Sequence, residues 1–325
     1  MKRWKHIIAG AIAAMMVVLL VGGCRSGTTS SASGGDAKTV RIALQPTVTW
    51  APLVYMKEKG TLGEALKSKG IQVQWTEFQA GPALNESFAA GQQDVGVAGD
   101  VPIISALAAG QSYKIVGQGG RSDRSVAIIA GKDSGITSPA QLKGKKIGLT
   151  VGSSGHGLVY SVLQKQGLTL QDVSLVNITP GDAEAALTSK EVDAVAFWEP
   201  NITFLLDKHE GTVLADLQGI PNGGGPIFAT EAYAKAHPEV VQTILEEYAK
   251  AGQYIKDHPE EVAPVLAPHL NCTPEQVVNI LKEYDYSVNI TPQDVEGLQY
   301  TARFLQEIGA IAGAIDIKQY IEADK

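Results

Sequence analysis

The fold of this chain is decided by two similar stretches, Phe88-Ala89-Ala90-Gly91-Gln92-Gln93-Asp94-Val95-Gly96-Val97 and Leu187-Thr188-Ser189-Lys190-Glu191-Val192-Asp193-Ala194-Val195-Ala196. In each stretch a helical run ends, a tight turn delivers an aspartate, and a strand of small residues follows. Each strand then leads to an acid with a proline close behind it, Asp100 in the first unit and Glu199 in the second. We therefore expect two related units whose strand ends correspond, with an acid at the carboxyl edge of each sheet.

Short β-rich runs alternate with helical patterns on both sides of these stretches, which is typical of a parallel α/β sheet. In the first half we predict strands at 40–44, 73–77, 95–98, 115–116 and 126–130, and helices at 53–59, 82–90 and 102–109. In the second half we predict strands at 146–149, 174–178, 192–197 and 212–217. The expected fold class is α/β, with two lobes that are each a mixed, mostly parallel sheet flanked by helices.

The last third of the chain has a different pattern. After Gly223-Gly224-Gly225, a strand at 226–230 leads into helical patterns at 231–236, 238–255, 259–266, 273–284 and 291–308. This tail has no strands of its own, so its apolar faces must pack on an existing core, most simply that of the first lobe. We predict residues 39–131 as the first part of lobe 1, 132–225 as lobe 2, and 226–325 as the return of lobe 1. Crossings near 131–134 and 223–230 would form a hinge.

Composition excludes several classes of protein. The 325 residues are 44% hydrophobic and 19% charged, which is ordinary for a folded chain too long for one small core. The net charge is −7 and the basic residues are scattered after the N-terminus, so nucleic acid is not an expected partner. The two cysteines, Cys24 and Cys272, lie in regions of different character and do not predict a disulfide framework.

The N-terminus indicates export. Basic residues at positions 2, 3 and 5 precede an apolar run at 7–21 that is short for a membrane span of about 20 residues. Val21-Gly22-Gly23-Cys24 resembles the lipobox of bacterial lipoproteins, in which the signal is cleaved before the cysteine and the thiol is lipidated. We expect residues 1–23 to be a signal peptide and 24–38 a flexible tether. The alternative is an uncleaved membrane anchor, and both readings place the body outside the cytoplasm.

Five motifs carry a family resemblance: Trp75-Thr76-Glu77-Phe78-Gln79-Ala80-Gly81-Pro82, Asp94-Val95-Gly96-Val97-Ala98-Gly99-Asp100-Val101-Pro102, Leu142-Lys143-Gly144-Lys145-Lys146-Ile147, Val192-Asp193-Ala194-Val195-Ala196-Phe197-Trp198-Glu199-Pro200 and Ala236-His237-Pro238-Glu239-Val240. In this order they resemble the aliphatic-sulfonate, taurine and nitrate branch of the solute-binding proteins of ABC importers. The resemblance covers residues 39–310. Two turns depart from the aliphatic-sulfonate pattern. Asp100 replaces the glutamate of its G-E-x-P turn, and Glu199 replaces the aspartate of its W-D-P turn.

The resemblance implies a two-lobed, periplasmic-binding-protein-like fold that closes on a small polar ligand at a hinge. It also implies ABC permease and ATPase subunits as partners. We expect no enzyme activity, no cofactor and no metal, and a monomer anchored by its lipidated Cys24 to the outer face of the bacterial cell membrane. An organosulfonate such as an aliphatic sulfonate or taurine is the expected ligand. Nitrate, a carboxylate and a thiamine-precursor-like heterocycle are alternatives, as is a role in ligand sensing.

A small anion can be held by the free N–H groups of helix N-termini, and three such termini are expected at the cleft. They begin at Gly81-Pro82, at Val101-Pro102 and at Gly152-Ser153-Ser154-Gly155-His156. The third is the most informative, because glycines allow close backbone approach and two hydroxyls add donors. The candidate ligand-binding residues are Gln45, Thr47, Gln79, Gly81, Gly99, Asp100, Arg121, Ser153, Ser154, His156, Trp198 and Glu199.

Several of these candidates have a second interpretation. Trp198 would form an apolar wall or belong to the core, and His156 would donate to a ligand oxygen or pack elsewhere. Asp100 and Glu199 would cap helices, meet a cationic group on a zwitterionic ligand, or pair with a nearby arginine, Arg121 or Arg124.

An enzyme of related fold is the main competing class. The sequence has no G-x-S-x-G, H-E-x-x-H or P-loop motif. Ser154 and His156 are close in sequence, yet no orienting acid or oxyanion site can be located for them. The H-x-x-C pair of His269 and Cys272 is too small a set for a metal site.

Overall fold

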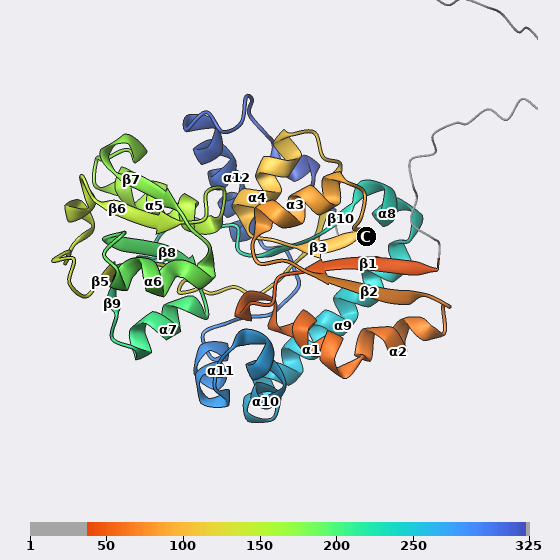
Figure 1. Ribbon diagram of the computed structural model, residues 1–325. Helices are drawn as coiled ribbons and strands as arrows, with labels where there is room; N and C mark the ends of the chain where they lie inside the picture. The colour runs from red at the N-terminus through yellow and green to blue at the C-terminus, as the bar shows by residue number, and fades with distance from the viewer. Residues whose placement is uncertain (1–37, 323–325) are drawn as a thin grey trace, which may run out of the picture. The chain divides into compact units, whose positions relative to one another are not determined.

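The computed structural model describes residues 38–322, and these form two lobes that each contain a five-stranded sheet (Figure 1). The sheet of lobe 1 has the order β2-β1-β3-β10-β4. Its strands are β1 (Thr39–Leu44), β2 (Gln72–Glu77), β3 (Val95–Val97), β4 (Tyr113–Gln118) and β10 (Pro226–Thr230). Strands β1, β2 and β3 are parallel, whereas β10 runs antiparallel to both β3 and β4. The sheet is therefore mixed and mostly parallel.

Helices cover both faces of this sheet. The first part of the chain supplies η1 (Val48–Trp50), α1 (Ala51–Lys59), α2 (Thr61–Lys67), α3 (Gly81–Ala89) and α4 (Asp100–Ala108). Helices α1 and α2 pack with one apolar cluster, and α3 and α4 pack with another on the opposite face. Strand residues alternate between these clusters, since Ile42 belongs to the first and Ala43 to the second.

Lobe 2 repeats the plan of lobe 1, with the strand order β7-β6-β8-β5-β9. Its strands are β5 (Val126–Gly131), β6 (Lys146–Leu149), β7 (Ser174–Asn177), β8 (Ala194–Trp198) and β9 (Gly211–Asp216). Its helices are η2 (Pro139–Leu142), α5 (Ser154–Lys165), η3 (Leu170–Asp172), η4 (Pro180–Asp182), α6 (Ala183–Thr188) and α7 (Asn201–Asp207). Strands β3 and β8 hold equivalent third positions, so the two stretches that open the sequence argument are structural equivalents.

The chain crosses between the lobes in the segments 119–125 and 217–225, which join β4 to β5 and β9 to β10. The prediction that the strand at 126–130 belongs to lobe 1 is wrong, because β5 pairs antiparallel with β8 and also pairs with β9. The first crossing therefore comes before Val126 and not near residue 131. Periodicity alone could not show this, since a buried strand has the same pattern in either sheet.

After β10 the chain is helical: α8 (Glu231–Ala236), α9 (Pro238–Asp257), α10 (Pro259–Leu270), α11 (Pro274–Leu281), α12 (Pro292–Glu307) and η5 (Ile317–Gln319). Helices α9 and α10 bury apolar faces on the α1 side of lobe 1, with Ile244 and Leu266 nearly inaccessible. Helix α12 packs beside α4 on the other face and also contacts α5 of lobe 2. The tail thus completes lobe 1 and reaches across to its neighbour.

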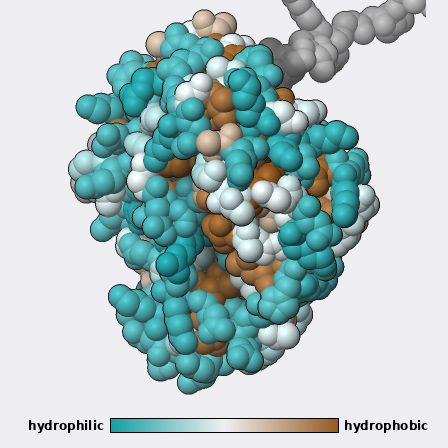
Figure 2. Space-filling view, turned by 90° about the vertical axis from the view of Figure 1, so that its left-hand side faces the viewer, coloured by the Kyte–Doolittle hydropathy of each residue, from teal (hydrophilic) through white to brown (hydrophobic). Residues whose placement is uncertain are grey.

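The outer surface is largely hydrophilic, and hydrophobic residues gather in hollows on the face that Figure 2 shows. Within residues 38–322, no helix combines the length and the apolar character that crossing a bilayer would require. The predicted signal peptide, the tether and Cys24 lie outside the described residues.

Candidate functional site

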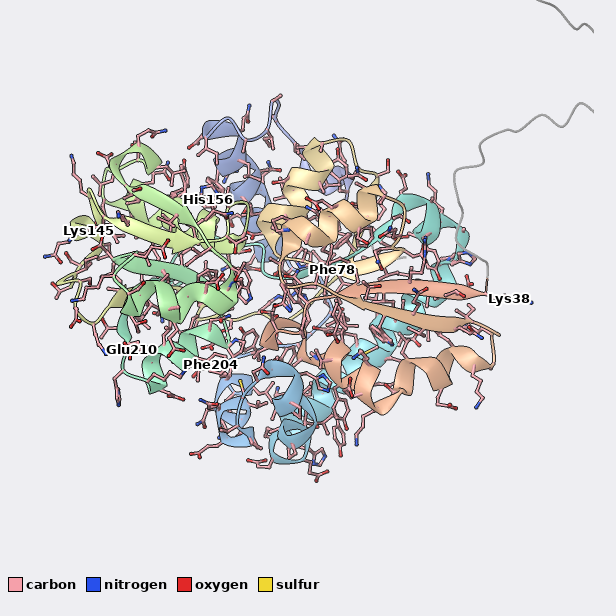
Figure 3. All side chains as sticks on the ribbon, in the orientation of Figure 1. Lys38, Phe78, Lys145, His156, Phe204 and Glu210 are labelled. Atoms are coloured by element: carbon pink, nitrogen blue, oxygen red, sulfur yellow. The ribbon has the colours of Figure 1, made fainter. Side chains whose placement is uncertain are left out.

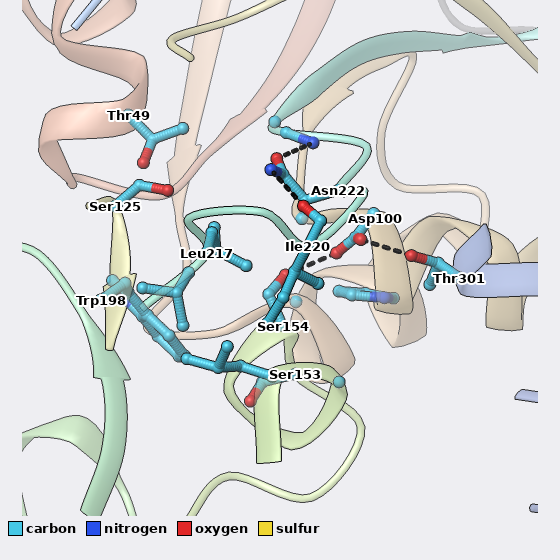
Figure 4. A pocket seen from close by; sticks show the side chains of 18 of the residues that line it. Thr49, Asp100, Ser125, Ser153, Ser154, Trp198, Leu217, Ile220, Asn222 and Thr301 are labelled. Carbon is cyan, nitrogen blue, oxygen red and sulfur yellow. Dashed lines mark hydrogen bonds between the residues drawn. The ribbon is translucent and has the colours of Figure 1, made fainter. Parts of the chain in front are cut away.

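The candidate site is a cavity between the lobes, at the carboxyl ends of the parallel strands of both sheets (Figure 4). Its volume of about 70 Å³ is several times what one buried water needs, so it has room for a compact small molecule. It is lined by Gln45, Thr47, Thr49, Trp50, Gly81, Gly99, Asp100, Pro102, Gly120, Ser125, Val126, Ser153, Ser154, Gly157, Leu158, Ser161, Trp198, Leu217, Ile220, Pro221, Asn222, Gly224, Gly225, Tyr300, Thr301 and Phe304.

Three helices begin at this cavity, as the sequence predicts: α3 at Gly81, α4 at Asp100 and α5 at Ser154. Their first N–H groups have no partner within the helix, and each N-terminus carries partial positive charge. Small residues let these ends converge, since a Cβ at Gly99 would collide with the Ser154 hydroxyl. The convergence gives the cavity a set of backbone donors from both lobes.

Two hydroxyls in the cavity lack a protein partner. Thr47 of lobe 1 and Ser153 of lobe 2 are only 6% and 3% exposed, and neither Oγ atom makes a hydrogen bond. Both residues stand directly before a helix, where a serine or threonine hydroxyl ordinarily caps the first turn, yet neither side chain does so. Leaving a buried hydroxyl unpaired costs about 1–3 kcal/mol, so these two groups await a partner in the cavity.

Asp100 joins three elements at one wall of the cavity. Its Oδ1 accepts from the Ser154 hydroxyl at 2.8 Å and from the Val101 N–H at 2.9 Å, and its Oδ2 accepts from the Thr301 hydroxyl at 2.6 Å (Figure 4). Ser154 begins α5 of lobe 2, and Thr301 lies on α12. The carboxylate therefore links the lobes by hydrogen bonds, and it is 7% exposed.

The opposite wall is apolar. Trp198, at the end of β8, faces Leu217 and Ile220 from the second crossing segment (Figure 4). Trp50 adds a second indole, whose Nε1 donates to the Gly225 carbonyl at 3.1 Å. Burying a ligand's alkyl chain against these surfaces would contribute about 25 cal/mol of favourable free energy per Å² of apolar area.

Arg121 and Arg124 lie outside the cavity lining and are committed elsewhere. Arg121 binds Asp294 at the start of α12, with its Nε 2.9 Å from Oδ1 and its Nη2 2.7 Å from Oδ2. Arg124 pairs with Glu283 at 3.3 Å. The predicted alternative in which either arginine pairs with Asp100 or Glu199 is therefore wrong. The two arginines instead tie the first crossing segment to the helical tail.

His156 is buried but does not line the cavity. It lies on α5 (Figure 3). Its ring meets Phe304 of α12 edge-on at a centroid distance of 6.0 Å, and its Nδ1 accepts from the Gly152 N–H at 3.4 Å. Burial lowers the pKa of the imidazole, which favours the neutral ring. The structure thus places His156 in the contact between α5 and α12. A hydrogen bond from His156 to a ligand oxygen stays a prediction.

Two glutamines have different positions. Gln45 lines the cavity directly after β1, and its Nε2 donates to the Val97 carbonyl at 3.3 Å. Gln79 is exposed and lines a separate pocket, together with Phe78 of lobe 1 and Phe204 of lobe 2.

Glu199 does not line the cavity with Asp100. Its Oε2 accepts from the Thr203 N–H at 3.1 Å, so it serves the first turn of α7. It lines a separate space between lobe 2 and the segment after α11, together with Tyr284. Burial raises the pKa of Glu199 to about 7, although the hydrogen bond from Thr203 acts in the opposite direction. The two acids that the sequence places at equivalent strand ends thus have different environments.

The cavity has no obvious means to hold a metal ion. Among residues 38–322, no three or more His, Cys, Asp or Glu side chains are grouped in a way that would bind one. Within the described part of the chain, the lining contains one formally charged side chain, Asp100, and otherwise hydroxyls, amides, backbone and apolar groups.

Comparison with known proteins assigns the family. The profile of the family described as NMT1/THI5 like matches residues 50–262, which is more than half of the chain. The chain belongs to the NMT1/THI5-like family. A relative from Bacillus subtilis (strain 168), named for the binding of aliphatic sulfonates, is 31% identical over 318 residues, which cover 96% of this chain and 94% of the relative. The taurine-binding periplasmic protein of Escherichia coli (strain K12) is 26% identical over 277 residues, covering 78% and 84%.

A solved structure supports the fold of this NMT1/THI5-like protein. The alkanesulfonate-binding protein SsuA from Xanthomonas axonopodis pv. citri, bound to MOPS, has a TM-score of 0.82 at 28% identity, covering 89% of this chain and 99% of that protein. The two-lobed α/β fold and the family resemblance predicted from the motifs are therefore confirmed.

Sequence reasoning missed part of the lining of this NMT1/THI5-like protein. Tyr300, Thr301 and Phe304 come from α12, which the periodicity assigns only to packing. A signal was present, because Thr301 is a polar residue inside the apolar stripe formed by Leu298, Ala302 and Leu305. The second crossing, predicted near 223–230, lies at 217–225 in the structure, and its part in the site was not predicted. It contributes Leu217, Ile220, Pro221, Asn222, Gly224 and Gly225 to the lining.

Proposed function

We propose that this protein is the lipid-anchored, extracytoplasmic solute-binding subunit of an ABC importer and captures a small organosulfonate between its lobes. The printed functions of the relatives support the ligand class, since they name aliphatic sulfonates, taurine and, for a solved neighbour, bound MOPS. The protein acts as a monomer that presents its closed form to permease and ATPase subunits.

One observation carries the proposal: the unpaired Oγ atoms of Thr47 and Ser153 in a cavity between the lobes. A sulfonate has three oxygens that accept hydrogen bonds and no hydrogen to donate. It can therefore accept from a hydroxyl of each lobe and from nearby helix N-termini at the same time. Because the donors come from both lobes, such a ligand favours the closed arrangement over any open one.

The site is better suited to binding than to catalysis. Ser154 donates to the Asp100 carboxylate directly, and the His156 ring lies outside the cavity, so the pair has no serine–histidine contact for general-base activation. Burial also raises the pKa of the Cys272 thiol to about 12, which disfavours a nucleophilic thiolate.

The anchor belongs to the proposal as well. Cleavage before Cys24 and lipidation of its thiol would hold the two lobes at the outer face of the membrane through residues 24–38. In cells that produce the protein, Cys24→Ser should shift it from the membrane fraction to the soluble extracytoplasmic fraction. Retention in the membrane would favour the uncleaved anchor.

Calorimetric titration of the mature chain from residue 24, produced without lipid, tests the ligand class. Ethanesulfonate, butanesulfonate and taurine are compared with nitrate, acetate and a pyrimidine. We expect the sulfonates to bind, and we expect Thr47→Val and Ser153→Ala each to weaken binding about 5- to 100-fold, the equivalent of 1–3 kcal/mol.

Ser68→Ala is the matched control, because this exposed serine lies at the end of α2 and should leave affinity unchanged. Binding of nitrate, acetate or the pyrimidine in place of sulfonates would refute the ligand class. Sulfonate affinity that is insensitive to both hydroxyl replacements would refute the site.

A further inference from the structure

The cavity is chemically asymmetric, and we propose that its Asp100 wall selects ligands that carry a cationic donor group at the end opposite the sulfonate. The expected ligand class is therefore a short aminoalkanesulfonate, and Asp100 is the specificity-determining residue. This inference rests on the proposed function, because the anionic end of the ligand is assigned to the donors described above.

The first argument is charge. Of the residues that the structure describes, Asp100 is the one formally charged side chain in the lining, and no Lys, Arg or His lines the cavity. The nearby arginines cannot neutralise it, since Arg121 is held by Asp294 and Arg124 by Glu283. A purely anionic ligand would thus enter a cavity that already contains a buried carboxylate, and repulsion between like charges is stronger away from bulk water. A ligand with a cationic group would meet attraction instead.

The second argument is the direction of the hydrogen bonds. Asp100 is the acceptor in all three of its bonds, and the donors are Ser154, Thr301 and the Val101 N–H. A hydroxyl has one hydrogen, so Ser154 and Thr301 have no donor left for a ligand and present oxygen lone pairs. The expectation that Ser154 donates to the ligand is therefore not supported by this geometry. The side chains of this wall, Asp100, Ser154 and Thr301, can therefore accept hydrogen bonds from a ligand but have none left to donate.

The unpaired donors are two other hydroxyls, one from each lobe. The unpaired hydroxyls belong to Thr47, directly before η1, and to Ser153, directly before α5. A ligand that satisfies both groups of residues needs an acceptor-only end and a donor-only end. A sulfonate and an alkylammonium meet these two requirements, and the apolar wall of Trp198, Leu217 and Ile220 suits the short carbon chain between them.

Taurine and isethionate form the matched pair for the test, because they differ only in an ammonium or a hydroxyl on the same two-carbon sulfonate. We expect taurine to bind the wild-type protein at least about tenfold more tightly at pH 7. Asp100→Asn should reduce the preference to within about threefold. Ser154→Ala keeps the carboxylate and should keep the preference.

The wild-type ratio requires no variant, so the inference remains testable if Asp100→Asn does not fold. Equal binding of taurine and isethionate overturns the inference and leaves sulfonate capture intact. A second pair, β-alanine and 3-hydroxypropionate, separates the two proposals: if only the carboxylates bind and β-alanine is preferred, the role of Asp100 holds and the sulfonate assignment fails. Loss of all preference in Ser154→Ala would also contradict the assignment to Asp100.

Discussion

The Glu199→Gln substitution should stabilise the folded protein at pH 8 by about 2 kcal/mol more than at pH 5. Glu199 is partly buried between lobe 2 and the tail, and it receives one hydrogen bond, from the Thr203 N–H. Burial is the main cause of its raised pKa, and the charge of Asp207 adds to it. Glutamine has the same shape, keeps a carbonyl acceptor for Thr203 and cannot ionise.

The sign and size follow from linkage. The pKa is 4.5 for the free side chain and about 7 in the folded protein, so the folded state binds this proton more tightly. The stabilisation is fully present below pH 4.5, is lost as the pH rises through 7, and changes little above that. At 1.36 kcal/mol per pKa unit the full range is about 3 kcal/mol, and about two thirds of it lies between pH 5 and pH 8.

Urea denaturation of wild type and variant at both pH values measures the difference, because other titrating groups cancel in the comparison at each pH. The exposed Glu86→Gln is the control and should change the free energy of unfolding by less than about 0.5 kcal/mol at either pH. An equal effect of Glu199→Gln at pH 5 and pH 8 would show that this carboxyl titrates normally and would refute the burial argument.

Three further substitutions test the supports of the site. Arg121→Met should lower the free energy of unfolding at pH 7 by about 3 kcal/mol in urea denaturation, because it leaves the 6%-exposed Asp294 carboxylate without its partner. The deficit should shrink in acid, since Arg121 and Thr291 hydrogen bonds lower the pKa of Asp294 despite its burial. Gly225→Ala should weaken ligand binding in calorimetry and cost about 1–3 kcal/mol of stability, because its methyl would lie 2.9 Å from the Trp50 ring. Thr273→Ala should lower stability by about 1 kcal/mol, measured by urea denaturation, since its hydroxyl caps α11 by accepting from the Gln276 N–H.

The parts of the fold that the sequence predicts are those governed by short-range patterns. Strand and helix positions follow from periodicity, and the helix N-termini at Gly81, Asp100 and Ser154 follow from glycine, proline and hydroxyl positions. The lobe to which β5 belongs does not follow, because it depends on pairing with β8, more than 60 residues away in the chain.

The site shows the same limit. Gln45, Thr47, Gly81, Gly99, Asp100, Ser153, Ser154 and Trp198 are brought together in the lining, whereas Gln79, Arg121, His156 and Glu199 are not. Each residue of the first group ends or follows a strand, or stands at the start of a helix, at the cavity-facing edge of one of the two sheets. Arg121 and Glu199 also lie near strand ends, but their partners, Asp294 and the Thr203 N–H, divert them. The position of a residue relative to a strand end thus predicts that it lies near the cleft. The direction of its side chain depends on hydrogen-bond partners that are distant in the sequence.

The hydrogen bonds at the cavity, made and unmade, also explain how a small ligand controls closure of the two lobes. The lobes already contact each other through the Asp100–Ser154 hydrogen bond and through the Tyr300 hydroxyl, which donates to Ser161 at 3.1 Å. Reversing a 1:99 equilibrium to 99:1 requires about 5.5 kcal/mol of differential binding. Pairing the buried hydroxyls of Thr47 and Ser153 recovers about 1–3 kcal/mol each, and helix N-termini add further donors. A ligand of a few heavy atoms therefore supplies enough binding free energy to close the lobes when the open and closed forms of the free protein have similar free energies.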